Sequence, residues 1–394
     1  MPKIIYLDDA ATTRLNPEVL DAMMPYLTEM YGNPSSIHSF GAECSAACEK
    51  ARKIIANLIN AKDNEIYFTS GGSESDNWAI KSVAYMKKDK GKHIITSAIE
   101  HHAVMETCEF LAREGYDVTF VGVDDKGIIK IDELKAAIRP DTILISVIYA
   151  NNEIGTIQPI KEIGEIARSK GILFHTDAVQ AFGHIPIDVE KENIDLLSAS
   201  AHKVNGPKGV GMLYMKNSVK LAPMMHGGPH ERKRRAGTLN VPGIVGFGKA
   251  AEISKGTMAE NIVKVTEMRN YLIDRLLKEI PHSRLNGDRE RRLPGNANIS
   301  FRYIEGESML MMVDMKGIAA STGSACASGS LDPSHVLLAI GLPHEIAHGS
   351  LRMTMSEHTT KEELDYTVEA LKEVVAKLRS MSPLYEDAIK NKEA

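Results

Sequence analysis

Cysteine is scarce in this chain, and its scarcity bears on where the protein works. The 394 residues include only 4 cysteines, too few for the disulfide framework of a secreted protein. We therefore expect a reducing, cytoplasmic compartment. Cys44 and Cys48 lie four residues apart in a helical pattern with no second cysteine pair to complete a zinc site. Together with Cys108 they are expected to pack in the interior.

Long apolar runs and a large excess of either charge are also missing. No apolar segment approaches the length that spans a bilayer. The N-terminus becomes acidic at Asp8, before the core of a signal peptide could form. A net charge of −5 offers no general basic field for nucleic acid. The sequence thus argues against membrane insertion and against nucleic-acid binding.

Apolar strand-like runs alternate with helical periods from about residue 17 to residue 255. This alternation predicts an α/β fold, with a three-layer large domain whose mostly parallel sheet is covered on both faces. Ligands of such sheets bind beyond the carboxyl ends of the strands. Helices such as 103–114 and 160–170 lie between several strands. The expected strands are 65–69, 93–97, 118–121, 142–148, 172–176, 194–199 and 210–214.

The last third of the chain predicts a smaller α+β domain. Helical segments within about 242–280 would bridge the two parts. The predicted large domain is 15–255, and the small domain comprises 1–14 and 256–394, with a mobile loop at about 321–333. The expected elements of the small domain are strands 296–301, 318–320 and 350–354 and helices 307–315, 335–340 and 361–379.

Lys203 follows the apolar run that ends near residue 199 and precedes a Gly-Pro turn. A lysine amine held at the mouth of a sheet and partly desolvated can form a Schiff base with a carbonyl. A solvated loop lysine is the alternative. The segment 70–77, rich in Ser and Gly, leads from a strand into a helix and favours an anion cradle of backbone N–H groups. Such a turn can also be purely structural.

Other polar residues follow strands of the same predicted sheet. Asp177 ends an apolar strand and could hold a protonated pyridine nitrogen, the interaction that makes pyridoxal phosphate an electron sink. It could equally cap a helix. Gln180 could reach the same ring, Asn152 offers an amide at the same edge, and the imidazole of His101 could stack on a ring. Each of these residues, taken alone, is also compatible with an ordinary loop position.

Taken together, these segments resemble the cofactor-site motifs of the cysteine desulfurases. That family belongs to the aminotransferase class V group of fold-type I pyridoxal-phosphate enzymes. The resemblance extends from Tyr6 to about Pro383. The motifs that carry it are Ser70-Gly-Gly-Ser-Glu-Ser-Asp-Asn77, Glu100-His101, Asn151-Asn-Glu-Ile-Gly155, Asp177-Ala-Val-Gln180 and Ser200-Ala-His-Lys203.

The resemblance implies a role for each site residue. Lys203 would form the Schiff base with pyridoxal 5'-phosphate, Asp177 would pair with the ring nitrogen, and His101 would stack on the ring and take part in catalysis. Asn152 and Gln180 would contact the hydroxyl side of the ring. The resemblance assigns the phosphate to Gly72, Ser73, Ser200, His202 and, from the partner subunit of a homodimer, Thr238.

A thiol distinguishes desulfurases from related aminotransferases. Cys326 lies in a run of small residues, 321–330, which predicts an exposed, mobile loop. A single cysteine can also be inert, but the run resembles the persulfide loop of the family. Arg352 matches the arginine that binds the substrate carboxylate, a task for which a guanidinium is suited. Asn152 is expected to bind the substrate as well.

The implied reaction removes sulfur from L-cysteine, giving L-alanine and a persulfide on Cys326. The sulfur would pass to an acceptor or to an iron–sulfur scaffold protein, and Cys326 could transiently bind an iron–sulfur cluster. No resident metal is expected.

Alternative functions remain open at this point. A selenocysteine lyase or a small-amino-acid aminotransferase would use the same cofactor, and a sulfur carrier without catalytic activity is a third reading. The segment His344-Glu-Ile-Ala-His348 has the pattern of a zinc hydrolase. Pro343 before it and Gly349 after it leave barely one helical turn, which disfavours a zinc site.

Overall fold

The structure, a computed structural model, describes residues 4–322 and 333–387. Its larger part is built on a 7-stranded sheet in the order β2-β8-β7-β6-β5-β3-β4. Strands β3 to β7 pair in parallel, whereas β8 runs antiparallel to both β7 and β2. The predicted mostly parallel sheet is therefore confirmed. The strands are β2 (Ile66–Thr69), β3 (His93–Ser97), β4 (Asp117–Val121), β5 (Thr142–Ser146), β6 (Leu173–Asp177), β7 (Leu196–Ser200) and β8 (Gly211–Met215).

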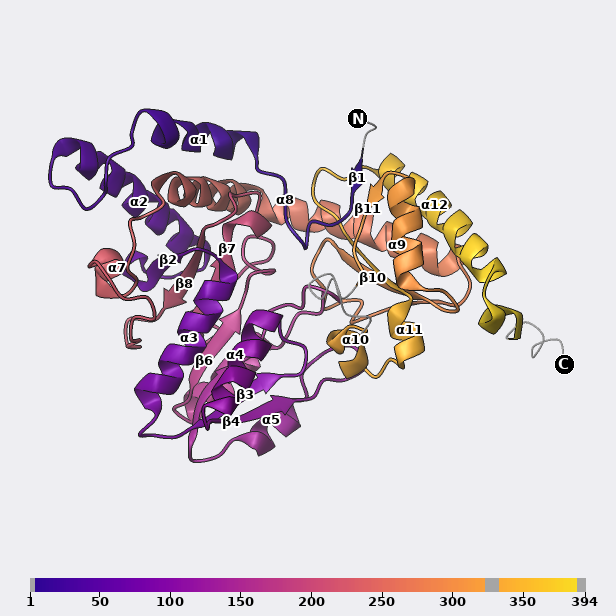
Figure 1. The fold of residues 1–394 in the computed structure, drawn as a ribbon, viewed down its shortest axis with the longest axis horizontal. Coiled ribbons are helices and arrows are strands. Elements are labelled where there is room, and N and C mark those ends of the chain that lie inside the picture. Colours follow the sequence, from indigo (N-terminus) through magenta and orange to yellow (C-terminus); the bar gives the residue numbers. More distant parts are fainter. Residues whose placement is uncertain (1–3, 323–332, 388–394) are drawn as a thin grey trace.

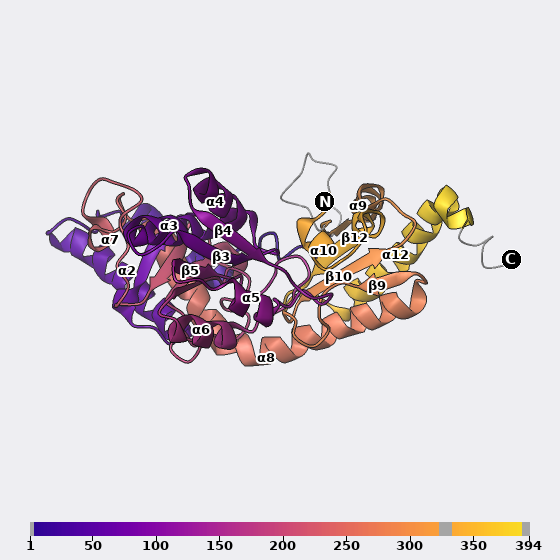
Figure 2. The same ribbon diagram turned by 90° about the horizontal axis from the view of Figure 1, so that it is seen from below.

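Helices cover both faces of this sheet (Figure 2). One face packs against α3 (Gly72–Lys87), which contacts β5 to β8, and against α4 (His102–Arg113). The other face packs against α2 (Ser39–Leu58) and α6 (Ile160–Ser169). Every residue of β3, β5, β7 and β8 is buried, as expected for strands covered on both sides. Helix α1 (Pro17–Thr28) lies further out, and α5 (Ile131–Ala137) lies beside β4.

A single helix, α8 (Val241–Glu279), runs along both parts of the molecule (Figures 1 and 2). The sequence suggested several helical segments in this range. The helix stays unbroken because its one proline, Pro242, lies in the first turn, where no backbone N–H is needed. Asn240 caps it by accepting the N–H of Gly243. The predicted bridge is thus one continuous helix.

The smaller part combines short sheets with helices. A 3-stranded antiparallel sheet has the order β12-β10-β9, and β1 pairs in parallel with β11. Its strands are β1 (Ile5–Tyr6), β9 (Ser283–Leu285), β10 (Asn296–Phe301), β11 (Ile318–Ala319) and β12 (Ser350–Thr354). Its helices are α9 (Gly306–Met315), α10 (His335–Ala339), α11 (His344–His348) and α12 (Lys361–Ser380). This matches the predicted α+β architecture.

Two large apolar clusters occupy the two parts of the molecule, and each draws on distant segments. Ile5 and Leu7 pack with residues between 265 and 375 in one cluster, so the N-terminal segment joins the smaller part. Val336 and Leu337 of α10, however, pack in the core of the large sheet. The proposed boundary at residue 255 falls inside α8, so the two parts share that helix.

Two further observations concern the cysteines and the membrane. Cys44, Cys48 and Cys108 are free and buried, in line with a packing role. Within residues 4–322 and 333–387, no helix has both the length and the apolar character required to cross a bilayer.

A buried ion pair fixes the loop around α7 (His230–Lys233). Arg52 donates through Nη2 and Nη1 to the Glu231 carboxylate at 2.7 and 2.9 Å, and the two side chains are 3% and 1% exposed. The Phe68 N–H also donates to Glu231, at 2.8 Å. Glu231, Arg232 and Lys233 all have positive φ angles (44°, 55° and 65°). This left-handed conformation is costly for such residues, and the buried pair holds it in place.

We expect Glu231→Gln to lower the free energy of unfolding by about 3–5 kcal/mol, because the buried Arg52 guanidinium loses its buried counter-charge and keeps only the exposed Glu49. Denaturation in urea measures the change. Lys161→Gln is the matched control, since Lys161 and Glu165 form an exposed pair at 4.0 Å. The control should unfold like the wild type. Equal effects of both substitutions would contradict a special role for the buried pair.

Candidate active site

A cavity of about 280 Å³ lies where the carboxyl ends of β6 and β7 meet the first turn of α3. It brings together residues from distant parts of the sequence, and most of them were singled out from the sequence. The predicted site residues that line it are Gly72, Ser73, His101, Asn152, Asp177, Gln180, Ser200, His202, Lys203 and Arg352.

Lys203 comes directly after β7, at the end of a short 3₁₀ turn (Ala201–Lys203). Its Nζ donates to the carbonyl oxygens of Ala10 and Ala11, at 2.5 and 2.8 Å. The backbone carbonyl of Lys203 contacts His184 Nε2 at 2.8 Å. The amine is therefore held at the cavity wall rather than solvated in a loop.

Asp177 is the last residue of β6 and is 4% exposed. Its Oδ1 accepts the N–H of Val179 at 2.9 Å, so the carboxylate makes a local turn and also lines the cavity. A turn rather than a helix follows Asp177, so the alternative of a helix cap is wrong, and its role toward a cofactor ring stays a prediction. Burial raises the pKa of Asp177, while His101, the Val179 N–H and Lys203 oppose the rise.

His101 caps α4 and faces the same cavity. Its Nδ1 accepts the N–H of Ala103 at 3.1 Å. Burial is the main cause that lowers the pKa of His101, with Asp177 opposing it and Lys203 adding to it. A neutral ring whose Nδ1 accepts a hydrogen bond carries its proton on Nε2. The ring is therefore fixed in position and in tautomer.

One end of the cavity suits an anion. Gly72 and Ser73 open α3, a 16-residue helix whose N-terminus carries partial positive charge. Ser200 and His202 lie beside them. Burial lowers the pKa of His202 to about 4, with Lys203 and Lys208 adding to the effect. Neutral His202 contacts Thr12 through Nδ1 at 3.1 Å, which leaves Nε2 as a possible donor.

Arg352, on β12, reaches the cavity from the smaller part of the molecule. Its Nη2 donates to Asp8 at 2.9 Å and its Nη1 to the carbonyl oxygen of Asn152 at 3.3 Å. Its Nε is buried and finds no hydrogen-bond partner among residues 4–322 and 333–387. Sequence reasoning missed Asp8, whose pairing with Arg352 spans 344 positions.

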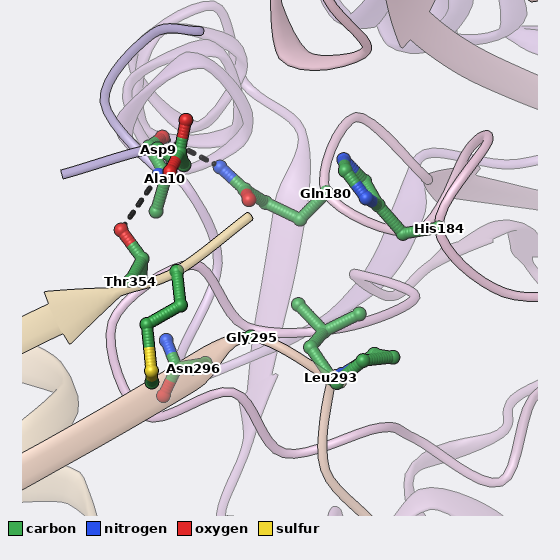
Figure 3. A pocket seen from close by; sticks show the side chains of 10 residues that line it. Asp9, Ala10, Gln180, His184, Leu293, Gly295, Asn296 and Thr354 are labelled. Carbon is green, nitrogen blue, oxygen red and sulfur yellow. Dashed lines mark hydrogen bonds between the residues drawn. The ribbon is translucent and has the colours of Figure 1, made fainter. Parts of the chain in front are cut away.

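A small neighbouring pocket, whose lining is drawn in Figure 3, shares Ala10 and Gln180 with the cavity. Ala10 accepts from Gln180 Nε2 at 2.9 Å, and its own N–H donates to Thr354 Oγ1 at 2.8 Å. Asp9 also lines this pocket, and burial, together with Glu357, raises the pKa of Asp9 to about 7. The segment around Ala10 thus separates the two spaces and is fixed from both sides.

One predicted residue of the described part of the chain does not line this cavity, and one lies outside the described residues. Thr238 is exposed and does not line the cavity of its own chain. Cys326 and most of the predicted loop lie outside the described residues. The pattern His344–His348 forms α11, only 5 residues long. Among the residues that the structure describes, no group of His, Cys, Asp and Glu side chains is arranged to hold a metal ion.

Comparison with known proteins identifies the family. Residues 5–367 match the aminotransferase class-V family. The chain belongs to this family. Enzymes of the family depend on pyridoxal phosphate.

Individual relatives resemble the chain over nearly its whole length. A cysteine desulfurase IscS from Methanosarcina thermophila is 58% identical, over 97% of this chain and 94% of that protein. A cysteine desulfurase IscS from Clostridium botulinum is 55% identical over 100% of both chains. A solved NifS-like protein superposes with a TM-score of 0.90 at 38% identity, covering 95% of this chain and 100% of that one. The family resemblance inferred from the motifs is confirmed.

The anion end of the cavity has no room for a side chain at residue 72. A Cβ built on Gly72 would lie 2.6 Å from Val179 Cγ2. We expect Gly72→Ala to weaken binding of pyridoxal phosphate to the cofactor-free protein at least tenfold, because Val179 must shift into the cavity. Fluorescence titration with pyridoxal phosphate measures the affinity.

The double variant Gly72→Ala/Val179→Ala relieves the contact and should recover most of the affinity. If the second substitution restores nothing, close packing of residue 72 against residue 179 is not what shapes this end of the cavity.

Proposed function

We propose that this protein is a cysteine desulfurase that uses pyridoxal 5'-phosphate. One observation carries the proposal: a single cavity holds an amine, a carboxylate at a strand end, an imidazole, a helix N-terminus and a guanidinium. The names of the relatives favour this reaction over that of a selenocysteine lyase or an aminotransferase.

The donor set fits the cofactor. An anionic phosphate suits the first turn of α3, where Ser73, Ser200 and His202 offer hydroxyl and ring donors. Asp177 would pair with the ring nitrogen, and the Lys203 amine would form the Schiff base with the carbonyl carbon of the cofactor. Asn152 and Gln180 would contact the hydroxyl side of the ring, with His101 against its face. Bound there, the ring supplies an electron sink for bonds at the substrate α-carbon.

The residues of the chain bind the substrate and move its protons. Lys203 Nζ takes up and returns the proton at the substrate α-carbon, and the carbonyl oxygens of Ala10 and Ala11 hold this amine as it changes charge. His101, neutral and with its proton on Nε2, can donate at that atom. The guanidinium of Arg352 binds the substrate carboxylate, and its unpartnered Nε is available for this contact.

The sulfur transfer involves Cys326. Its thiolate attacks the substrate sulfur, the bond between that sulfur and the β-carbon breaks, and a sulfur–sulfur bond forms. The electron pair of the broken bond stays with the β-carbon, which takes up a proton, so L-cysteine becomes L-alanine and the Cys326 thiolate becomes a persulfide. The outer sulfur then passes to an acceptor thiol or to an iron–sulfur scaffold protein. This places the enzyme at the start of iron–sulfur cluster assembly.

We further propose a cytoplasmic homodimer in which Thr238 reaches the phosphate of the partner subunit. The exposed position of Thr238 outside its own cavity supports this arrangement.

The function is tested with L-cysteine and a thiol reductant, which should yield alanine and sulfide in equal amounts. Lys203→Ala and Cys326→Ala should each lower the rate by more than about 100-fold, the scale on which a nucleophile or proton-transfer group acts. The Cys326→Ala protein should still show the cofactor absorption band. Cys108→Ala removes a buried cysteine and is the matched control. Sulfide release that continues without the Cys326 thiol would refute the proposed mechanism.

Substrate recognition is tested at Arg352. We expect Arg352→Lys to lower kcat/KM for L-cysteine about 10- to 100-fold, because an ammonium cannot form the bidentate hydrogen bonds that a guanidinium forms with a carboxylate. L-cysteine methyl ester lacks the carboxylate and should be affected much less. A loss of the same size for both compounds would show that Arg352 does not recognise the carboxylate.

A further inference from the structure

The floor of the cavity contains a second carboxyl group that the proposed mechanism does not use. Asp76 lies on α3, one turn after Gly72, and its side chain is 1% exposed. It lines the same cavity as Asp177. Its Oδ1 is buried, and no group in the described part of the chain donates a hydrogen bond to it. A buried carboxylate oxygen without a donor is costly when it is charged.

The side chains beneath Asp76 provide no positive charge. Ser146, His175 and Ser198 lie on β5, β6 and β7. His175 contacts Ser146 Oγ through Nδ1 at 2.8 Å and Ser198 Oγ through Nε2 at 3.1 Å. Burial lowers the pKa of His175 to about 3, so the ring is neutral. Asp76 Oδ1 lies 3.6 Å from His175 Nε2, and a proton on Oδ1 would supply a donor that this neutral ring can accept.

The charged groups that face Asp76 also favour its protonated form. Burial raises the pKa of Asp76 well above its usual value, and the neighbouring carboxyl groups of Asp177 and Glu100 raise it further. Only the Ser198 hydroxyl opposes the rise. Burial raises the pKa of Glu100 itself to about 8.

Asp177 has the partners that Asp76 lacks. His101, Lys203 and the Val179 N–H all favour its ionised form. Two carboxyl groups that share a site of low dielectric do not both ionise, and the better-supported one keeps the charge. The proton therefore goes to Asp76.

We propose that Asp76 is a protonated acid in the floor of the cavity, which leaves Asp177 as the anion that faces the cofactor ring. The neutral acid lets Asp177 keep its charge without a second negative charge beside it. The protonation of Asp76 is a property of the cofactor-free fold, whereas its effect on the ring rests on the proposed function. The two parts can therefore be tested separately.

The first test follows the stability of the cofactor-free protein against pH. Below pH 4, Asp76 is protonated in both the folded and the unfolded chain. As the pH rises, the unfolded chain ionises and the folded chain does not, so the wild type loses stability that Asp76→Asn retains. The unfolding constant of the wild type relative to the variant should rise by up to about tenfold per pH unit. Urea denaturation from pH 4 to pH 8 measures this ratio.

The first test includes a control variant, Glu106→Gln, and a second neutral replacement, Asp76→Ser. Glu106→Gln removes an exposed carboxylate of α4 and should follow the wild type at every pH. Asp76→Ser is smaller, and its baseline stability can differ, but it should show the same slope with pH as Asp76→Asn. A ratio that does not change with pH overturns the proposal. Failure of both neutral variants to fold also overturns it, because a site that already holds a neutral group tolerates a neutral replacement.

The second test titrates the visible absorption band of bound pyridoxal phosphate in the wild type and in Asp76→Asn. If Asp76 is neutral, the apparent pKa of the band stays within experimental error. If Asp76 is ionised, removing its charge disfavours the protonated cofactor, and the apparent pKa falls. A fall overturns the assignment of the proton to Asp76 and of the negative charge to Asp177. A protein with no such band contradicts the proposed function but leaves the stability test valid.

Discussion

The hydrogen bonds of residues 8–13 fix the position of Arg352, from the smaller part of the molecule, relative to Lys203, from the larger part. Asp8 binds Arg352, which comes from the smaller part of the molecule. Ala10 and Ala11 bind Lys203, which comes from the end of β7 in the larger part. One short segment, which turns at residues 9–11, therefore determines how far the guanidinium lies from the amine. A reaction that fixes a substrate carboxylate while acting at the adjacent carbon depends on that spacing.

The same segment also fixes the anion end of the cavity. Thr13 binds the carbonyl oxygen of His202 through both its N–H and its hydroxyl, at 3.0 and 2.9 Å, and Thr12 contacts the His202 ring. Because β1 and Leu7 are part of the smaller core, the segment is anchored before it crosses to the larger part. Helix α8 is a second segment that runs through both parts, so their relative position is fixed by more than one connection.

Much of this arrangement could be predicted from the sequence, and the remainder depends on contacts between distant residues. Strand 93–97 was predicted with its observed ends, because apolar residues bounded by polar ones mark it clearly. Strand 142–148 was predicted too long, since Val147 and Ile148 continue the buried apolar run after the ladder ends at Ser146. The confirmed segments are those in which local pattern and tertiary burial agree.

Asp8 and Asp76 were missed because neither has a local signal. An aspartate in a short acidic pair and an aspartate in the first turns of a helix are both ordinary surface positions. Their importance comes from what faces them: Arg352, 344 positions away, for Asp8, and the buried sheet for Asp76. A sequence pattern reports which face of an element is apolar, but it does not report which polar groups meet across the core.

Two ion pairs fix the loop 229–238, although its residue Thr238 is exposed. The loop is tied to α2 through Arg52 and Glu231, and to the first turn of α3 through Arg235 and Glu74, whose nitrogen and oxygen are 2.9 Å apart. Glu74 directly follows Ser73 at the anion end of the cavity. The loop is therefore held beside the anion end of the cavity in its own chain while Thr238 remains exposed. An exposed residue on a rigid support is ready for contact with another surface at little cost in conformational entropy. That property is what a residue acting across a subunit interface requires.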